Sequence, residues 1–180
     1  MPGFIPEITT RVKVEIDLSG IDEALDIIQS DDVLSDIPSL TDELNERRTQ
    51  LQSLQSPLGE VISKSLKSNQ EMIISSKHYI TGMMANSVDI FSDGDDYLVG
   101  NTAMSVDGFP YPLAIETGRR EVFPIDAKVL RWFEGGNFSK PIFAKHSGSV
   151  KADPFVEPSI EDTMYDIDEI VDEIFDAVVR

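Results

Sequence analysis

The chain of 180 residues suits one domain, and its 41% hydrophobic content is enough for a sizeable core and excludes wholesale disorder. Its 33 acidic residues outnumber 15 basic ones, and the net charge of −18 disfavours broad binding of DNA or RNA and docking on anionic lipid. The lack of cysteine excludes disulfides, thiol nucleophiles and thiolate metal sites.

The N-terminal segment, MPGFIPEITTRVKVEIDL, has neither an early basic cluster nor an apolar run, so we predict no signal peptide. No apolar run in the chain approaches the roughly 18 residues of a membrane-spanning helix. Apolar residues alternate with charged ones from Val12 to Leu18, which predicts a half-buried strand. Ser19 is then expected to open a short helix as its N-cap, with Asp22 at the capping-box position.

Residues 30–56 are predicted to form an acidic helical insertion or extension within a single domain that spans residues 1–180. The helix expected over residues 40–54 has a narrow apolar seam interrupted by Arg47 and Arg48. Because this face is thin, the helix should either pack on a neighbouring chain or lie loosely at the edge of the domain.

The middle of the chain is predicted to hold a helix over residues 57–75, one or two helical turns over residues 81–86, and then a β-hairpin. The runs SVDIFS and YLVGNT favour strands and flank Asp93-Gly94, which is a strong hairpin turn signal. This pattern indicates a small antiparallel sheet.

Three short elements and one long helix are expected after the hairpin. They are a helix over residues 113–117 ended by Gly118 as an αL cap, a helical turn or two over residues 128–133, and a strand over residues 141–144. The final helix should be capped near Asp153 and Ser159. Its apolar stripe consists of Ile160, Met164, Ile167, Val171, Ile174 and Val178. Together these elements predict an α+β fold, with several helices around a small antiparallel sheet and a long amphipathic C-terminal helix.

Charge is segregated along the sequence. Between Gly118 and Lys151, seven basic residues and three acidic ones give a local charge of +4, which leaves −22 for the rest of the chain. From Asp153 to Asp176 there are ten acidic residues and no basic one. This segregation suits head-to-tail contact between copies of the chain, and ordinary solvated faces with a bias in charge would give the same pattern.

The sequence contains no recognisable catalytic or metal-binding pattern. His78 and His146 are 68 residues apart, and there is no GxSxG elbow. The acidic turn at residues 93–96 lacks the spacing of a calcium loop, and Gly135-Gly136 lacks a P-loop or dinucleotide fingerprint. We therefore predict no enzymatic activity, no metal site and no cofactor.

Arginine and aromatic residues cluster in the basic segment and just before it. Such a combination is typical of interface hot spots, and an arrangement with the aromatics in the core and the arginines paired to nearby acids fits equally well. The residues predicted to contact another subunit or a neighbouring protein are Arg119, Arg120, Lys128, Arg131, Lys140, Lys145, Tyr111 and Trp132.

The stretch from Thr81 to Glu161 contains, in order, TGMMANSVDI, YLVGNT, DGFPYPLAIETGRR, LRWF, PIFAK and ADPFVEPSIED. This series resembles the tail-completion or minor tail protein family of tailed viruses, also described as head–tail joining or neck proteins. The opening VKVEIDLSGIDEALDII is similar to the first strand and helix of that family. Arg119 stands where the family's turn has a small hydroxyl residue. The resemblance assigns structural roles within the motifs to Gly82, Glu116, Gly118, Pro154 and Phe155.

The resemblance implies a structural virion protein with neither enzymatic activity nor cofactor, assembled in the host cytoplasm and located in the neck or tail of the virion. It would form a ring, a hexamer or a dodecamer, between the head connector and the tail terminator or tail tube. The genome would pass through the ring without specific binding, and no membrane would be involved. A ring needs head-to-tail contacts, so we expect the basic segment to meet an acidic surface of the next subunit, and an acidic channel wall would repel DNA phosphates.

Other functions also fit the sequence. One is a head-completion adaptor or a tail-terminator ring, which would differ in its neighbours and copy number. Another is an acidic DNA mimic or other non-viral binding module, in which carboxylates imitate phosphates. An enzyme comes last, because the sequence shows no catalytic pattern, and its minimum evidence would be a turnover that His78→Ala abolishes.

Overall fold

A computed structural model describes residues 8–31, 34, 38–77, 82–104, 110–124, 128–133 and 141–179, and of residues 130–133, 141–142 and 177–179 it describes the backbone. It confirms the predicted α+β class. In chain order the elements are β1 (Thr9–Val12), α1 (Ser19–Ser30), α2 (Pro38–Ser53), α3 (Gln55–Lys77), the 3-10 turn η1 (Ala85–Ser87), β2 (Val88–Asp93), β3 (Asp96–Asn101), α4 (Tyr111–Thr117), β4 (Leu130–Phe133), β5 (Pro141–Ala144) and α5 (Val156–Val179).

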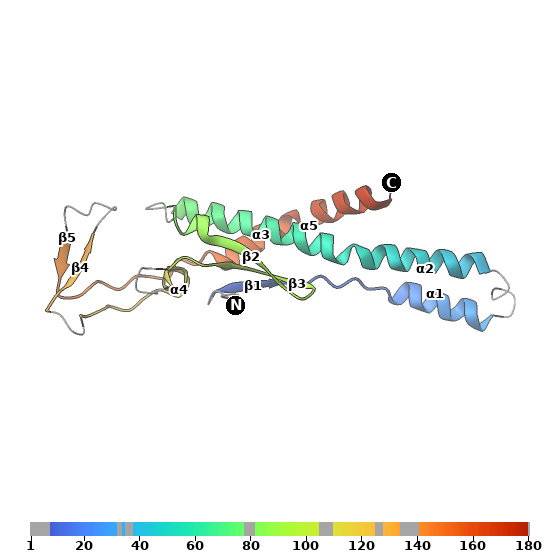
Figure 1. Ribbon diagram of the computed structural model, residues 1–180, viewed down its shortest axis with the longest axis horizontal. Helices are drawn as coiled ribbons and strands as arrows, with labels where there is room; N and C mark the ends of the chain where they lie inside the picture. Colours follow the sequence, from blue (N-terminus) through green and yellow to red (C-terminus); the bar gives the residue numbers. More distant parts are fainter. Residues whose placement is uncertain are drawn as a thin grey trace.

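The molecule is elongated (Figure 1). The sheet of β1, β2 and β3 lies at its centre with α3 and α5. The antiparallel pair of α1 and α2 extends from one end, and the segment that carries β4 and β5 extends from the other.

The central sheet is antiparallel, with the strand order β1-β3-β2. The predicted hairpin is confirmed, because β2 and β3 pair from Val88 opposite Asn101 to Asp93 opposite Asp96. Gly94 in its turn has a φ of 65°, which glycine adopts without the steric cost of a Cβ. β1 pairs with β3 along one edge, and no other described strand pairs with the outer edge of β1.

The strand predicted over residues 12–18 is wrong, since β1 ends at Val12. Val12 lies opposite Tyr97, and β3 begins one residue earlier at Asp96, so the partner strand turns away at this point. Residues 13–18 therefore continue without a partner strand and lead into α1. Their alternation of exposed and half-buried side chains persists, which is the pattern that suggested a strand.

The start of α1 depends on Asp17 and not on the predicted cap, Ser19. Ser19 is the first helical residue, and its backbone N–H donates a hydrogen bond to Asp17 Oδ1 at 2.9 Å. Hydrogen bonds from the side chain and backbone of Ser19 lower the pKa of the Asp17 carboxyl below its ordinary value, because they favour the charged form.

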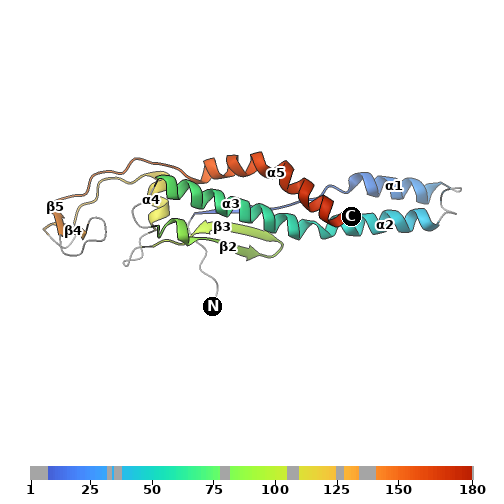
Figure 2. The ribbon, with the colours of Figure 1, turned by 90° about the horizontal axis from the view of Figure 1, so that it is seen from above.

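Helix α2, which forms most of the predicted extension, packs on α1 of its own chain. Leu25 and Ile28 of α1 are buried, and Arg48 of α2 contacts Asp22 of α1, with Nη2 3.3 Å from Oδ1. The helix breaks at the buried Leu54 and continues as α3, so α2 carries the line of α3 beyond the sheet (Figure 2).

Helix α3 covers one face of the sheet and builds the core. Leu66 and Ile74 are buried in one cluster with Val88 and Val99 of the sheet and with Phe155, which precedes α5. Helix α5 packs on the other side of α3, so that α3 lies between it and the hairpin strands (Figure 2).

The face of α5 that packs on α3 differs from the predicted one. Ser159 and Thr163 are buried, and Asn69 Nδ2 of α3 donates to Thr163 Oγ1 at 3.0 Å. Short polar side chains let the two helices approach closely, so the apolar stripe of α5 is turned partly away from α3. Ile160 and Met164, the first two residues of the predicted apolar stripe, are 38% and 58% exposed. Further along the stripe, the next apolar side chains are half-buried.

The helical turn predicted over residues 128–133 is wrong, and the strand predicted over residues 141–144 is confirmed. Residues 130–133 form β4, which pairs with β5 from Leu130 opposite Ala144 to Phe133 opposite Pro141. The sequence LRWF is compatible with a strand once a partner lies beside it, and that partner is distant in sequence.

Candidate functional site

The residues of the predicted interface lie mainly on an antiparallel projection, which we name the β-arm and define by the described residues 119–124, 128–133 and 141–151. At its base Arg119 and Val150 exchange two backbone hydrogen bonds of 2.8 Å, and Val122 and Ser147 pair further out. The strands β4 and β5 form its outer part. Figures 1 and 2 show the β-arm leaving the body beyond α4.

The predicted basic contact residues have different environments. Arg120, Lys128 and Lys145 are exposed on the β-arm. Arg119 is half-buried, and its Nη1 donates to Ser147 Oγ at 3.0 Å, so this arginine joins the two segments of the β-arm.

For most of the other predicted contact residues, the structure describes the backbone alone or nothing. Arg131 and Trp132 lie in β4, where the backbone is described. Lys140 lies outside the described residues. Tyr111 is the first residue of α4 and is exposed near the base of the β-arm, so the structure does not bring it together with the basic residues of the outer part.

Apolar side chains are exposed among these charges. Phe123 and Phe143 are 60% and 58% exposed, and Val122 and Val150 are also exposed. The ring of Phe123 lies 5.5 Å from the ring of His146, which in turn contacts Glu121 through Nδ1 and Oε1 at 2.6 Å. Clustered exposed apolar side chains mark interaction surfaces. No local sequence pattern marks Phe123 and Val122 as surface residues, because the pairing that places them on the β-arm joins residues far apart in the chain.

Four of the residues singled out by the family resemblance meet where α4, the β-arm and α5 join. Glu116 Oε2 accepts backbone hydrogen bonds from Phe155 at 2.9 Å and Val156 at 3.3 Å. A carboxylate at this position satisfies free N–H groups at the start of α5 and complements the helix dipole. The cap of α5 is therefore Glu116 from α4. The predicted capping by Ser159 is wrong, since its Oγ donates to Val156 O, and the other predicted capping residue, Asp153, contacts Lys77 Nζ at 3.2 Å.

Gly118 makes the close crossing at this junction possible. Its φ of 76° is positive as predicted, but its ψ of 171° is not that of an αL cap. A Cβ at this position would lie 2.8 Å from the backbone N of Ala152 and 2.9 Å from the carbonyl oxygen of Val150. Pro154 is exposed next to the buried Phe155, and Pro154 O accepts from Lys77 Nζ at 3.4 Å. Gly82 is not part of this junction and has a φ of 63° before η1.

An apolar groove of about 210 Å³ lies between β1, α3 and α5. Val12, Ile62 and Leu66 contribute from β1 and α3, and the exposed part of the α5 stripe forms the other wall. This groove could not be predicted from the sequence, because it depends on which face of α5 turns toward α3.

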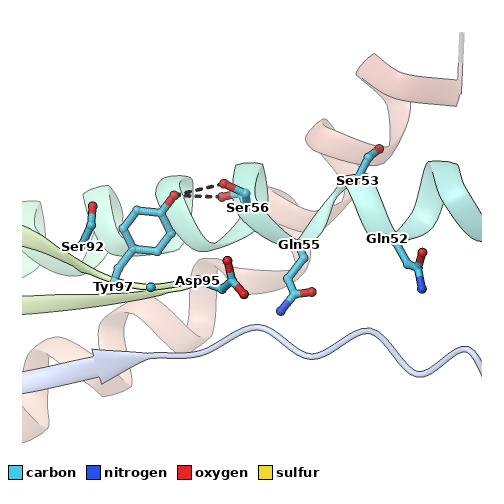
Figure 3. Close-up of a pocket in the computed structure, with 8 residues that line it drawn as sticks. Gln52, Ser53, Gln55, Ser56, Ser92, Asp95 and Tyr97 are labelled. Atoms are coloured by element: carbon cyan, nitrogen blue, oxygen red, sulfur yellow. Dashed lines mark hydrogen bonds between the residues drawn. The ribbon is translucent and has the colours of Figure 1, made fainter.

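A polar hollow of about 310 Å³ lies where the β2–β3 turn approaches the break between α2 and α3 (Figure 3). Tyr97 Oη lies 3.2 Å from Ser56 Oγ and 3.5 Å from Ser56 O. Its ring occupies the space beside Gly59, where a Cβ would lie 2.8 Å from a ring carbon. The hollow is lined by hydroxyl and amide groups and by the carboxylate of Asp95. The contacts of Tyr97 with Ser56 connect the hairpin to α3 at this point. Among the described lining residues, no hydrogen bond pairs a nucleophile with a base.

Within the described part of the chain, no cluster of three or more acidic or histidine side chains could hold a metal ion. Nor does any helix within those ranges have the length and apolar character needed to cross a membrane. Of the two histidines of the chain, His146 lies on the β-arm, and His78 lies outside the described residues.

Comparisons with family models, curated proteins and solved structures give no match to this chain. The resemblance of the segment from Thr81 to Glu161 to tail-completion proteins therefore stays a prediction.

Proposed function

We propose that this chain is a structural virion protein of a tailed virus, which forms a ring in the neck between the head connector and the tail terminator or tail tube. In this role it completes the tail or joins it to the head, uses no cofactor and catalyses no reaction. The genome passes through the ring without being held.

One observation carries the proposal. The basic β-arm, with its exposed aromatic side chains, projects from one end of an elongated molecule, and the rest of the chain is strongly acidic (Figure 1). Complementary surfaces at different places on one subunit produce head-to-tail contacts, which close into a ring when the rotation between neighbours permits.

Two further features support a passage for DNA. The chain outside the segment from Gly118 to Lys151 carries a charge of −22, and the acidic side chains described on α5 are exposed. Carboxylates along a channel repel phosphates and let a genome move without sticking.

The decisive experiment is a reconstruction of the virion by electron cryomicroscopy. The proposal expects this chain at the neck with rotational order. A neck built without the chain contradicts it, whereas a position on the head or at the tail end favours the adaptor or terminator function.

A functional assay complements the image. The variant Arg120→Glu with Lys145→Glu changes the charge of the β-arm by −4 and should abolish the joining of heads to tails. The matched variant Arg47→Glu with Lys64→Glu makes the same change on exposed residues of α2 and α3 and should join normally. Equal joining by both variants would contradict a contact through the β-arm.

An acidic DNA mimic is distinguished by a competition assay. A mimic blocks a basic DNA-binding protein stoichiometrically, because its carboxylates occupy the phosphate sites. The proposed virion protein leaves DNA binding unchanged at the same ratio.

A further inference from the structure

The groove beside α5 is mainly apolar and, among the described residues, open to solvent. Ile160 and Met164 are 38% and 58% exposed although they begin the main apolar stripe of the helix. Across the groove, Ile62 and Leu66 of α3 line the floor beside β1. Apolar side chains arranged around a groove gain free energy when a partner removes them from water.

The groove also borders an open strand edge. β1 occupies one edge of the sheet, and within the described ranges no strand pairs with its outer side. An open edge presents backbone N–H and C=O groups that can pair with an added strand. An extended segment with apolar side chains could therefore satisfy both the edge of β1 and the floor of the groove.

The α5 helix, which forms one wall of the groove, carries acidic side chains beside its apolar stripe. Four carboxylates lie along one line of α5, next to the apolar stripe, at spacings of one or two helical turns, and all are exposed: Glu157, Glu161, Asp168 and Asp172. Two cations line the groove itself, Arg11 on β1 and Lys13 just after it, and both are paired within the chain. Arg11 pairs with Asp93 and Asp96 at 2.8 Å, and Lys13 pairs with Glu15. The attraction for a cationic partner therefore comes from the exposed carboxylates of α5 beside the groove.

The β-arm has the complementary properties. It is extended, its Phe123 and Phe143 are exposed, and Arg120, Lys145 and Lys151 are exposed cations on the same element. The β-arm points away from the body in Figures 1 and 2, so the groove of the same molecule is not its binding site in this conformation.

We propose that the groove between β1 and α5 binds the β-arm of a second copy of this chain. A strand of the β-arm adds to the edge of β1, its aromatic side chains cover Ile160 and Met164, and its cations face the carboxylates of α5. This inference rests on the proposed function, because it names the surface through which neighbouring subunits of the ring would hold one another.

The acidic pair α1–α2 is the competing receptor for the β-arm, and it fits less well. Its buried apolar residues, Leu25 and Ile28, are already covered, and Ile27 is the large apolar side chain that it exposes within the described residues. It has no strand edge for an extended partner. Charge could attract the β-arm there, but the groove adds apolar contact and backbone pairing.

Crosslinking between two single-cysteine variants tests the inference directly, because the natural chain has no cysteine. Phe143→Cys on the β-arm is mixed with Met164→Cys in the groove, each with a tag of different size, and treated with an oxidant or a short bismaleimide. A heterodimer of intermediate size can form only between copies. The substituted side chains are exposed, and Ile160→Cys provides a second groove position.

The matched control mixes Phe143→Cys with Met72→Cys, whose methionine is exposed on α3. We expect the groove variants to give at least about five times the heterodimer of this control. A yield equal to the control at both groove positions overturns the inference, as does preferential crosslinking of Phe143→Cys to Ile27→Cys on α1.

These results separate the two proposals. If crosslinking to the groove fails and the virion reconstruction still shows a ring at the neck, the docking site is wrong and the proposed function stands. If crosslinking succeeds and the chain is absent from the neck, the β-arm and groove form an assembly with another role.

Discussion

The carboxylate of Glu116 holds two parts of the fold together, and its removal should have a measurable cost. Its Oε2 accepts hydrogen bonds from the backbone of Phe155 at 2.9 Å and of Val156 at 3.3 Å. Phe155 is fully buried, so in a Glu116→Ala variant its N–H has poor access to water. The same change removes a negative charge from the start of the long helix α5.

The expected loss of stability follows from these contacts. A hydrogen bond to a charged group contributes about 1.5–3 kcal/mol, and loss of a helix cap typically costs about 1 kcal/mol. The second hydrogen bond is long, so we expect Glu116→Ala to lower the free energy of unfolding by about 2 kcal/mol. For a chain of this size that corresponds to a decrease in Tm of about 6 °C.

Urea and thermal unfolding measure this loss of stability. Two further variants test whether it comes from the charged acceptor at the start of α5. Glu116→Gln keeps an acceptor oxygen without the charge and should fall between Glu116→Ala and the natural chain. Glu43→Ala removes an exposed helical glutamate from α2 and should change stability by less than about 0.5 kcal/mol. Amide hydrogen exchange at Phe155 and Val156 should accelerate in Glu116→Ala more than in Glu43→Ala. Equal stability of the two alanine variants would refute this account of the cap.

Three other predictions follow from the same structure. Gly118→Ala places a Cβ within 2.8 Å of Ala152 N at a φ of 76° and should lower the free energy of unfolding by about 2 kcal/mol, while Gly148→Ala, which has open space, should leave thermal unfolding unchanged. NMR titration should give Asp17 a pKa below 3.8, and Ser19→Ala should raise it part of the way back, because the backbone hydrogen bond remains. Since this pKa is lowered in the folded state, Asp17 stabilises the protein above about pH 4 and loses that contribution as the pH falls through the folded pKa. Asp17→Asn cannot titrate, so its free energy of unfolding should lie below that of the natural chain at neutral pH, and the difference should shrink as the pH falls. Association through the β-arm should weaken as salt rises from about 0.05 to 0.5 M in sedimentation experiments, and salt-independent association would contradict an electrostatic contribution.

Local sequence signals predicted the elements that depend on neighbouring residues. The β2–β3 hairpin was predictable because Asp93-Gly94 and its flanking strands are contiguous in sequence. The end of β1 was not, because it depends on where β3 begins, at Asp96. Likewise β4 is a strand because β5 lies beside it, and no local feature of LRWF supplies that information.

The face of α5 illustrates a different limit of sequence patterns. Periodicity indicates which face of a helix is most apolar, and here that face is only partly covered. Ser159 and Thr163 occupy the contact with α3 because short side chains permit close approach and find hydrogen-bond partners there. The structural roles of Glu116, Gly118 and Phe155 were predicted from the family resemblance. The exposure of Phe123 could not be predicted, because it depends on the pairing of distant segments in the β-arm.

The distribution of charge also bears on which contacts between copies are possible. The chain outside the segment from Gly118 to Lys151 carries −22, so two bodies that approach each other in most orientations repel. The β-arm is the part of the molecule that can approach an acidic body with a net attraction, and its length carries the contact away from the repelling surfaces of its own body (Figure 1). The charge therefore disfavours contacts in which one acidic body meets another and favours contacts in which a β-arm meets the body of a second copy. The ring that we propose would repeat such a contact in one direction, whereas a two-fold dimer would exchange the two β-arms, so the number of copies in the assembly distinguishes the two arrangements.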